Sequence, residues 1–308
     1  MVSNNPPDDH HFLPVFYLKR WTKSDGLIEF ARRGNGQIEG RPSYPRGTGY
    51  LPSLYKDRFE SDPVKAQALE IDFMQTIDRK AADALLELEQ GSKATWANEP
   101  GSDWSRFLLS LLFRVPEELD EFKRSYLEFF NKAVWPDENE YQRRKTTEMP
   151  DTLREFVELK RGLVESSGLK TFRTLIDHSG LVQLINSMTW TVFRLPGAKI
   201  ELLTSDRPVL MTATLSEENA YLLLPIGPRQ IFVAGKDKRT IERMRATNSE
   251  DKFVRIINSQ VVSHAAKYAY SSNYEQLRFI QNRLSTKTFE PLMARLYREM
   301  KSNHPRLR

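Results

Sequence analysis

Five polar residues stand in apolar surroundings and offer the types of side chain that chemistry needs: His11, Arg114, Asp206, Asn258 and His264. A histidine can accept or donate a proton near neutral pH, and an aspartate can orient it or act as the base itself. An arginine can hold a phosphate or carboxylate through two parallel hydrogen bonds. If these side chains share one cleft, they predict a hydrolase that acts on a phosphodiester or another anionic substrate.

His11 belongs to an aromatic stretch close to the start of the chain, His10-His11-Phe12-Leu13-Pro14-Val15-Phe16-Tyr17-Leu18-Lys19-Arg20-Trp21. Chain termini are usually poorly ordered, so this aromatic content indicates a segment that is buried against the rest of the protein. We expect His11 to be carried inward and His10 to remain exposed. A functional His11 would transfer protons; the alternative is a structural histidine that bonds a backbone carbonyl.

Arg114 follows the apolar segment 104–113 and is separated from Pro116 by one residue. Proline disfavours helical geometry in the residue before it, so we expect Arg114 at the C-terminal end of a buried helix. A buried guanidinium requires an anionic partner. That partner is either a group on a substrate or an internal acid such as Glu70 or Asp206.

The three remaining candidates lie in the C-terminal half. Asp206 belongs to the run Ser205-Asp206-Arg207-Pro208, directly after a predicted strand, where a general base or metal ligand is common and a turn is equally favoured. Asn258 and His264 lie on or beside the apolar stripe of a predicted helix. In the structural alternative, Asn258 bonds the backbone of a loop, because buried amides need partners.

Sequence motifs with an established mechanism do not occur in this chain. The phosphate-binding Gly-x-x-x-x-Gly-Lys-Ser/Thr, the zinc motif His-Glu-x-x-His and the nucleophile motif Gly-x-Ser-x-Gly are absent. The chain has no cysteine, which excludes disulfides, thiolate metal sites and a cysteine nucleophile. Asp206 and His11 could bind a divalent metal, but no carboxylate–histidine spacing supports it, so the sequence specifies no cofactor.

A second class of function rests on charge. The chain has a formal net charge of +5, and its C-terminal tail is basic: Arg278, Arg283, Lys287, Arg295, Arg298, Lys301, Arg306 and Arg308. This tail could bind nucleic acid, another phosphate-bearing ligand or a partner protein, although such a run is more often a solvated helix face. In a third interpretation, the polar residues only hold one core together, and function lies in a complex.

The elements that would position the candidates are helical in the first half and rich in strands afterwards. Helices are predicted at 63–90, 103–114, 116–134, 151–166, 171–187, 240–246 and 249–270, and strands at 189–195, 199–203, 209–212, 221–224 and 230–234. An early strand near 27–32 precedes a loop over 34–63. The pattern predicts an α+β fold with a helical majority packed on a small, mostly antiparallel sheet at about 189–235 plus the early strand.

The boundaries and location follow from composition. We expect a disordered leader at 1–10, a single α+β domain at 11–275 and a basic helix or tail at 276–308. No apolar run reaches about 18 residues, so no transmembrane helix is expected. The polar, acidic N-terminus does not resemble a secretion signal, and we therefore expect a cytoplasmic protein without a membrane partner.

Six short motifs occur in a specific order between residues 11 and 272. They are His11-x-x-Pro14-x-x-Tyr17-Leu18-x-x-Trp21, Arg114-x-Pro116, Ser205-Asp206-Arg207-Pro208, Leu224-Pro225-Ile226-Gly227-Pro228, Asn258 and Ala266-Lys267-Tyr268. This ordered set resembles an uncharacterised, mainly bacterial family, domain of unknown function 4238 (DUF4238). The chain departs from the family pattern at Arg207, where many relatives have Asn, and at Gly227, where a small polar residue is usual. The resemblance implies no activity, cofactor or catalytic residue.

Overall fold

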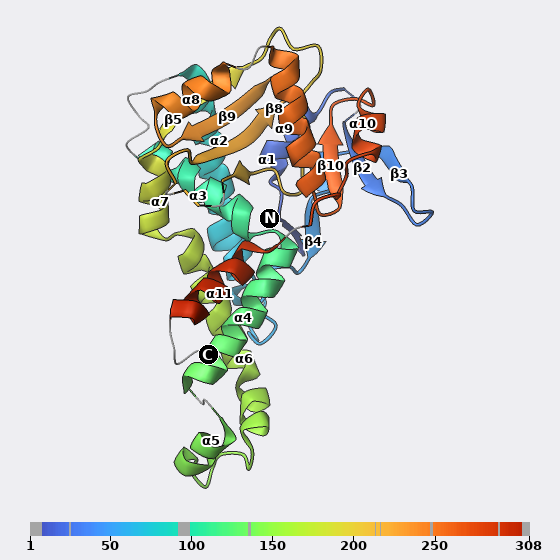
Figure 1. Ribbon diagram of the computed structural model, residues 1–308. Helices are drawn as coiled ribbons and strands as arrows, with labels where there is room; N and C mark the ends of the chain where they lie inside the picture. The colour runs from blue at the N-terminus through green and yellow to red at the C-terminus, as the bar shows by residue number, and fades with distance from the viewer. Residues whose placement is uncertain are drawn as a thin grey trace.

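The computed structural model describes residues 8–24, 26–91, 99–134, 137–212, 214–215, 217–246, 249–288 and 290–303 (Figure 1). The N-terminal elements are β1 (Asp9–His11), α1 (Val15–Leu18), β2 (Leu27–Arg32), β3 (Ile38–Ser43) and β4 (Tyr50–Pro52). The helical part contains α2 (Gln75–Gln90), α3 (Glu99–Phe113), α4 (Pro116–Val134), α5 (Glu138–Arg144), α6 (Leu153–Ile176) and α7 (Ser179–Asn186). The C-terminal part contains β5 (Thr189–Arg194), β6 (Thr204–Ser205), β7 (Leu210–Met211), β8 (Tyr221–Gly227), β9 (Gln230–Gly235), α8 (Lys238–Arg245), α9 (Glu250–His264), β10 (Tyr268–Ser271), α10 (Leu277–Gln281) and α11 (Leu292–Asn303).

The predicted fold class, α+β with a helical majority, is confirmed. In the described ranges the strands form three antiparallel sheets, with the orders β1-β4, β3-β2-β10-β6 and β5-β9-β8-β7. The early strand β2 does not join the sheet at 189–235. It pairs instead with β3, which follows it after a tight turn closed by the bond from Gly36 N to Arg33 O, and with β10 from near the C-terminus.

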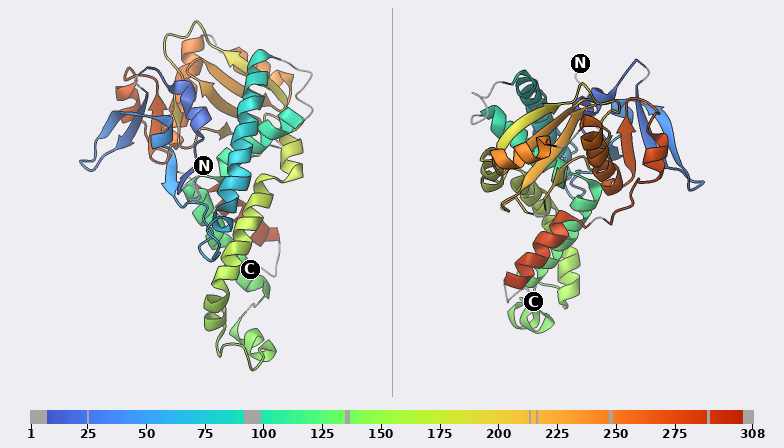
Figure 2. Two further views of the ribbon diagram at one scale, coloured as in Figure 1. Left: turned by 180° about the vertical axis from the view of Figure 1, so that it is seen from behind. Right: turned by 45° about the horizontal axis from the view of Figure 1, so that its top comes forward.

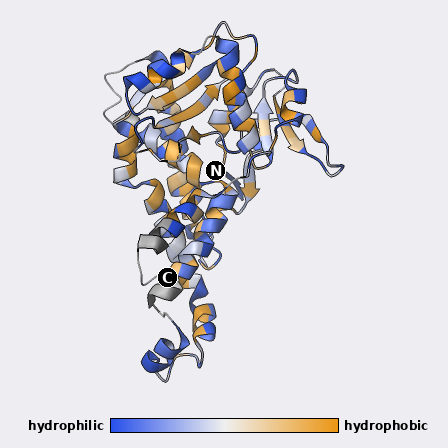
Figure 3. Cartoon of the chain, in the orientation of Figure 1, coloured by the Kyte–Doolittle hydropathy of each residue, from blue (hydrophilic) through white to orange (hydrophobic). Residues whose placement is uncertain are grey.

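Helices cover both faces of the sheet β5-β9-β8-β7 (Figures 1 and 2). Successive strand residues point to opposite faces. Leu222 and Leu224 of β8 therefore join a core that contains residues of α2 and α3, whereas Leu223 joins a second core that contains residues of α9. Because both faces are buried, β8 is apolar at nearly every position, and Figure 3 shows this sheet as mostly hydrophobic.

An arm made of α4 and α6 extends away from the sheets, with α5 at its far end and α11 lying along α4 (Figures 1 and 2). The predicted break at residues 166–168 is wrong, because α6 runs without interruption from Leu153 to Ile176. Gly168 allows α4 to approach: a Cβ at this position would lie 3.2 Å from the ring of Tyr126. The glycine is therefore a packing feature of α6 and does not end the helix.

Four further predictions differ from the structure. The loop predicted at 34–63 contains β3 and β4, and the strand predicted at 199–203 is irregular. The helix predicted at 249–270 ends at His264, after which β10 begins at Tyr268. The helix predicted from Pro63 starts with a 3-10 turn at Lys65–Gln67 and a π-helical turn at Leu69–Met74, and only then continues as α2.

Elements of regular structure lie near both ends of the described ranges. Strand β1 includes Asp9 and His10 from the predicted leader, and it pairs with β4; residues 1–7 lie outside the described ranges. In the predicted basic tail, α10 contacts β3 and α11 contacts α4. Among the described helices, none is both long and apolar enough to cross a membrane.

Candidate functional site

The aromatic stretch near the N-terminus is buried, as predicted, and it binds the C-terminal half of the chain. The Tyr17 hydroxyl lies 2.7 Å from Thr204 Oγ1 and donates to the carbonyl of Pro225 at 2.8 Å. Trp21 Nε1 donates to the carbonyl of Leu202 at 2.8 Å. Both aromatic side chains are fully buried. They hold one side of the segment 201–206. We use the name joint for this segment and the side chains that form hydrogen bonds to it.

Asn258 holds the joint from the other side. Its Oδ1 accepts from Leu203 N at 2.9 Å, and its Nδ2 donates to the carbonyl of Glu201 and to Gln276 Oε1, each at 2.9 Å. Gln276 Nε2 donates to the same carbonyl of Glu201 at 2.8 Å. The segment 201–203 is not a strand, so these amides satisfy backbone groups that a sheet would otherwise bond. Asn258 thus occupies the position that the structural alternative predicted.

Asp206 closes the joint against the chain that enters β10. Its Oδ1 accepts from Ala266 N at 2.8 Å, and its Oδ2 accepts from Lys267 N at 2.6 Å and Tyr268 N at 3.0 Å. Burial raises the pKa of Asp206 to about 6, and the three backbone donors oppose that rise. Both oxygens are thus engaged by backbone, as in a turn or cap.

His10 is buried, so the prediction that it is exposed is wrong. Its Nδ1 accepts from Tyr55 N at 2.9 Å, which leaves Nε2 to donate to Gln67 Oε1 at 3.0 Å. Its ring stacks on that of Tyr55 with the centroids 5.6 Å apart. Because every polar atom of the ring has a partner, His10 holds β1 to the segment 55–67 and has no atom free for chemistry.

Arg114 has a different environment. It follows the last residue of α3, as predicted, and its side chain is fully buried. Nη1 donates to Asp78 Oδ1 at 2.8 Å, and the guanidinium lies over the ring of Phe107 at 5.6 Å. Among the described residues, neither Nε nor Nη2 has a hydrogen-bond partner. Burying unpaired donors of a charged group is unfavourable, so these atoms require an explanation.

Glu70 lies on the π-helical turn that precedes α2. Its side chain is buried, Oε1 accepts a long bond of 3.5 Å from Gln75 Nε2, and Oε2 has no partner among the described residues. Burial and the neighbouring charge of Asp78 raise the pKa of Glu70 to about 7, against the opposing effect of Arg114. Turns of this kind are rare and are frequent at functional sites. A carboxyl group with this pKa can both donate and accept a proton near neutral pH.

Asp78 and His11 complete the group that we call the acid–base cluster: His11, Glu70, Asp78 and Arg114. Burial raises the pKa of Asp78, and the ion pair with Arg114 opposes the rise. Burial lowers the pKa of His11, although a hydrogen bond to the backbone of Arg46 and the charge of Asp9 act in the other direction. Its Nε2 has no partner among the described residues, so the neutral ring has a nitrogen available.

The acid–base cluster borders a cavity of about 570 Å³, which we call the His11 cavity. Three of its members line the cavity, namely His11, Glu70 and Asp78, whereas Arg114 lies behind the wall and is bonded to Asp78. Cavities of this size accommodate small organic ligands. In the described part of the chain, no group of three or more histidine, aspartate or glutamate side chains is placed to hold a metal ion.

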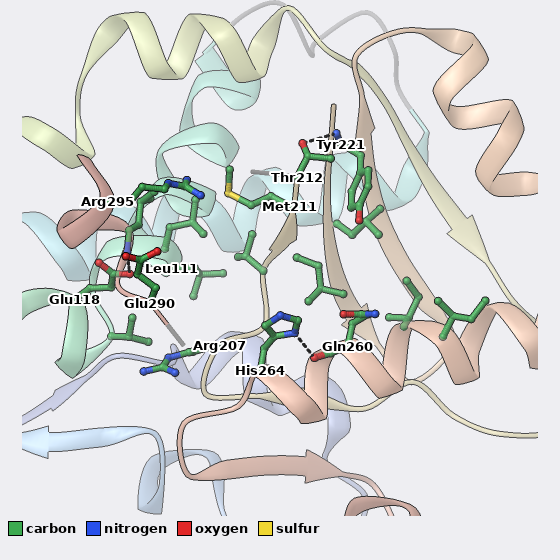
Figure 4. A pocket seen from close by; sticks show the side chains of 18 of the residues that line it. Leu111, Glu118, Arg207, Met211, Thr212, Tyr221, Gln260, His264, Glu290 and Arg295 are labelled. Carbon is green, nitrogen blue, oxygen red and sulfur yellow. Dashed lines mark hydrogen bonds between the residues drawn. The ribbon is translucent and has the colours of Figure 1, made fainter. Parts of the chain in front are cut away.

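His264 lies elsewhere. It lines a larger cavity of about 620 Å³, the His264 cavity, together with residues of α3, β7, β8, α9 and α11. Figure 4 shows its ring rising from the end of α9, with a bond from Nδ1 to the carbonyl of Gln260 at 2.8 Å. None of the residues that line this cavity also lines the His11 cavity.

The five predicted site residues are therefore divided among three places. His11 and Arg114 meet in the acid–base cluster, Asp206 and Asn258 hold the joint, and His264 lines the second cavity. The sequence interpretation did not select Glu70 and Asp78 as site residues. The sequence contained one signal for this site: apolar residues repeat every four positions at Leu69, Phe73, Ile77, Ala81 and Leu85. In a regular α-helix such a row of side chains would rotate around the helix by about 40° per step, so the spacing indicates a wider helical turn.

A comparison with protein families gives one match. The family model described as a protein of unknown function (DUF4238) matches residues 9–275, which is most of the chain. Neither a curated protein nor a solved structure matches the chain. The matched range includes the whole acid–base cluster and the joint with the exception of Gln276.

Proposed function

We propose that the chain, which belongs to the DUF4238 family, is a hydrolase of small anionic esters that acts through the acid–base cluster. The observation that supports this most directly is the environment of Glu70. Its pKa is raised to about 7 beside a buried guanidinium that has two nitrogens without a partner among the described residues. Strongly perturbed carboxyl groups with a specific charge partner in a cavity are characteristic of catalytic sites.

In the proposed reaction, the buried guanidinium of Arg114 attracts the anionic group of an ester that is bound in the His11 cavity. Asp78 holds the guanidinium in place and does not react. A buried guanidinium stabilises the negative charge that develops on the ester in the transition state, because few solvent dipoles compete with it.

Two members of the acid–base cluster move the protons. Neutral His11 accepts a proton at Nε2 from the attacking water, whose oxygen bonds to the phosphorus or carbonyl carbon. The bond to the leaving oxygen breaks, and protonated Glu70 gives its proton to that oxygen. The lowered pKa of His11 and the raised pKa of Glu70 favour these starting protonation states near neutral pH.

The test is hydrolysis of p-nitrophenyl phosphate, bis(p-nitrophenyl) phosphate and p-nitrophenyl acetate by the purified chain. We expect release of p-nitrophenolate from at least one anionic substrate and a loss of about 100-fold or more in Glu70→Gln and His11→Gln. Asp72→Asn is the matched control, because Asp72 is an exposed acid on the same π-helical turn. The proposal fails if no anionic ester is hydrolysed, or if Glu70→Gln and Asp72→Asn are equally active.

The alternative is a binding module for nucleic acid or protein that uses the basic tail, and the contacts of the tail favour it less. Arg298 pairs with Glu290, and Arg295 lines the His264 cavity. Lys301, Arg306 and Arg308 of that tail lie outside the residues whose side chains are described. A strong decrease in DNA or RNA affinity with rising salt would support the module instead.

A further inference from the structure

We propose that the His264 cavity binds an amphiphilic carboxylate, that is, a molecule with an apolar body and one carboxylate head. The cavity has a volume of about 620 Å³, which lies within the range of small-molecule sites in proteins. This inference is independent of the proposed hydrolase, because the two cavities share no lining residue.

The walls of the cavity provide the apolar surface. They come from both hydrophobic cores: Leu111 and Val115 belong to the first, and Leu210, Leu223 and Ile257 belong to the second. The cavity lies beside β7, a two-residue strand at the edge of its sheet, where the two cores meet and none of the described strands pairs with the outer side of β7. An apolar ligand body would also cover Ile256, which lines the cavity and is 47% exposed.

Arg295 provides the charge that a carboxylate requires. Figure 4 shows this side chain at one end of the cavity, close to Glu118 and Glu290. Those two acids are engaged elsewhere: Glu118 accepts from Leu292 N at 2.6 Å and from Met293 N at 3.0 Å, and Glu290 pairs with Arg298. In the described part of the chain, no carboxylate forms an ion pair with Arg295.

His264 provides a polar group on the cavity wall. His264 Nδ1 bonds the carbonyl of Gln260, so it acts as the donor and leaves Nε2 available to a ligand. The hydroxyl of Tyr221 also lines the cavity and bonds to none of the described residues. Arg207 also lines the cavity, but it pairs with Glu117 at 3.0 Å. A mainly apolar cavity in which Arg295 is the charged group without an ion pair among the described residues favours a ligand with a single charged end.

The experiment is isothermal titration calorimetry of the full chain with decanoate and with decanol. We expect saturable binding of one decanoate and about tenfold weaker binding of decanol, because only the carboxylate forms a charge-assisted bond to Arg295. Arg295→Gln should lower decanoate affinity about tenfold and leave decanol affinity unchanged. Arg255→Gln is the control, since Arg255 is exposed on α9 and does not line the cavity.

A second variant tests the location. Met211→Trp places a larger side chain on the cavity wall at β7, and it should weaken both decanoate and decanol. Equal affinities for the two probes, equal effects of Arg295→Gln and Arg255→Gln, or no saturable decanoate binding would each overturn the proposal. Unchanged unfolding midpoints of the variants ensure that these outcomes report on binding.

Discussion

Asp206 and Glu70 are both buried carboxylic acids whose pKa is raised by burial, yet their partners differ. Asp206 accepts three backbone hydrogen bonds within the joint. Glu70 accepts one long bond from Gln75, and its second oxygen has no partner among the described residues. The same contrast separates Asn258, which makes three bonds, from Arg114, which has two nitrogens without a partner in the described part of the chain.

From this difference we infer a structural role for the fully bonded groups and propose a functional role for the incompletely bonded ones. A fully bonded buried polar group stabilises the fold and specifies a unique arrangement. An incompletely bonded one lowers stability, and natural proteins retain such groups mainly where a substrate or ligand completes the bonding. The joint connects elements from both ends of the chain, whereas the acid–base cluster borders an open cavity.

The largest effect is expected in the joint. Asn258→Ala leaves Leu203 N and Gln276 Oε1 without their partner and creates a small void. We expect a loss of about 4 kcal/mol in the free energy of unfolding, measured by urea denaturation. Asn282→Ala, at an exposed position, should change it by no more than about 0.5 kcal/mol. Similar effects of the two variants would contradict a structural role for Asn258.

A slightly smaller effect with a distinct pH dependence is expected in the acid–base cluster. Arg114→Met removes the cation beside Asp78 and Glu70, so the pKa of each acid rises further. We expect a loss of about 3 kcal/mol near pH 8, where Glu70 of the unchanged chain is charged, and a smaller loss near pH 5, where Glu70 is protonated. Urea denaturation at the two pH values measures this difference. An equal loss at both pH values would show that Arg114 contributes only packing.

The smallest effect concerns one hydroxyl of the joint. Tyr17→Phe removes the bonds to Thr204 Oγ1 and to the carbonyl of Pro225 and keeps the buried ring. We expect thermal unfolding to report a loss of about 1.5 kcal/mol. Tyr44→Phe is the control, since Tyr44 is 67% exposed. If Tyr17→Phe is as stable as the control, the hydroxyl bonds do not contribute to the joint.

Local features of the fold were predictable from the sequence. Helix α4 occupies Pro116–Val134 as predicted, because proline in the first turn marks its start. Strands β8 and β9 begin at their predicted residues. They could be recognised because strands that are buried on both faces have a nearly continuous apolar sequence. The pairing of β2 with β10 was not predictable, because strand partners 240 or so residues apart are chosen by tertiary packing.

The site was predictable only in part, for the same reason. The sequence indicated that Arg114 is buried and needs an acid, but Asp78 could be identified only from the crossing of α2 and α3. The burial of His11 could be predicted from its aromatic neighbours. The partners of Asp206 and Asn258 could not, because they belong to segments that are distant in the sequence and pack together at the joint.

The central claim is that Asp206 stabilises the joint through three backbone hydrogen bonds, whereas charged Glu70 lacks comparable bonds. Burial raises the pKa of both acids, to about 6 for Asp206 and about 7 for Glu70, and makes the charged form of each unfavourable, so the hydrogen bonds are what separates the two sites. The pKa of folded Glu70 is about 7 against an ordinary value of 4.5. The unfolded chain therefore binds fewer protons than the folded one between these values, and stability falls as the pH rises through that window. By about pH 8 the loss is complete and amounts to at most about 3 kcal/mol.

The most direct measurement compares the free energies of unfolding of Glu70→Gln and Asp206→Asn near pH 8. Glu70→Gln removes a poorly bonded buried charge and should raise stability by about 1–2 kcal/mol. Asp206→Asn replaces one carboxylate oxygen by an NH₂ group, which cannot accept a hydrogen bond from the backbone N–H that it faces. The variant should therefore be less stable by about 2 kcal/mol. Opposite signs are the predicted result; a loss of stability in both variants would contradict the distinction between cluster and joint.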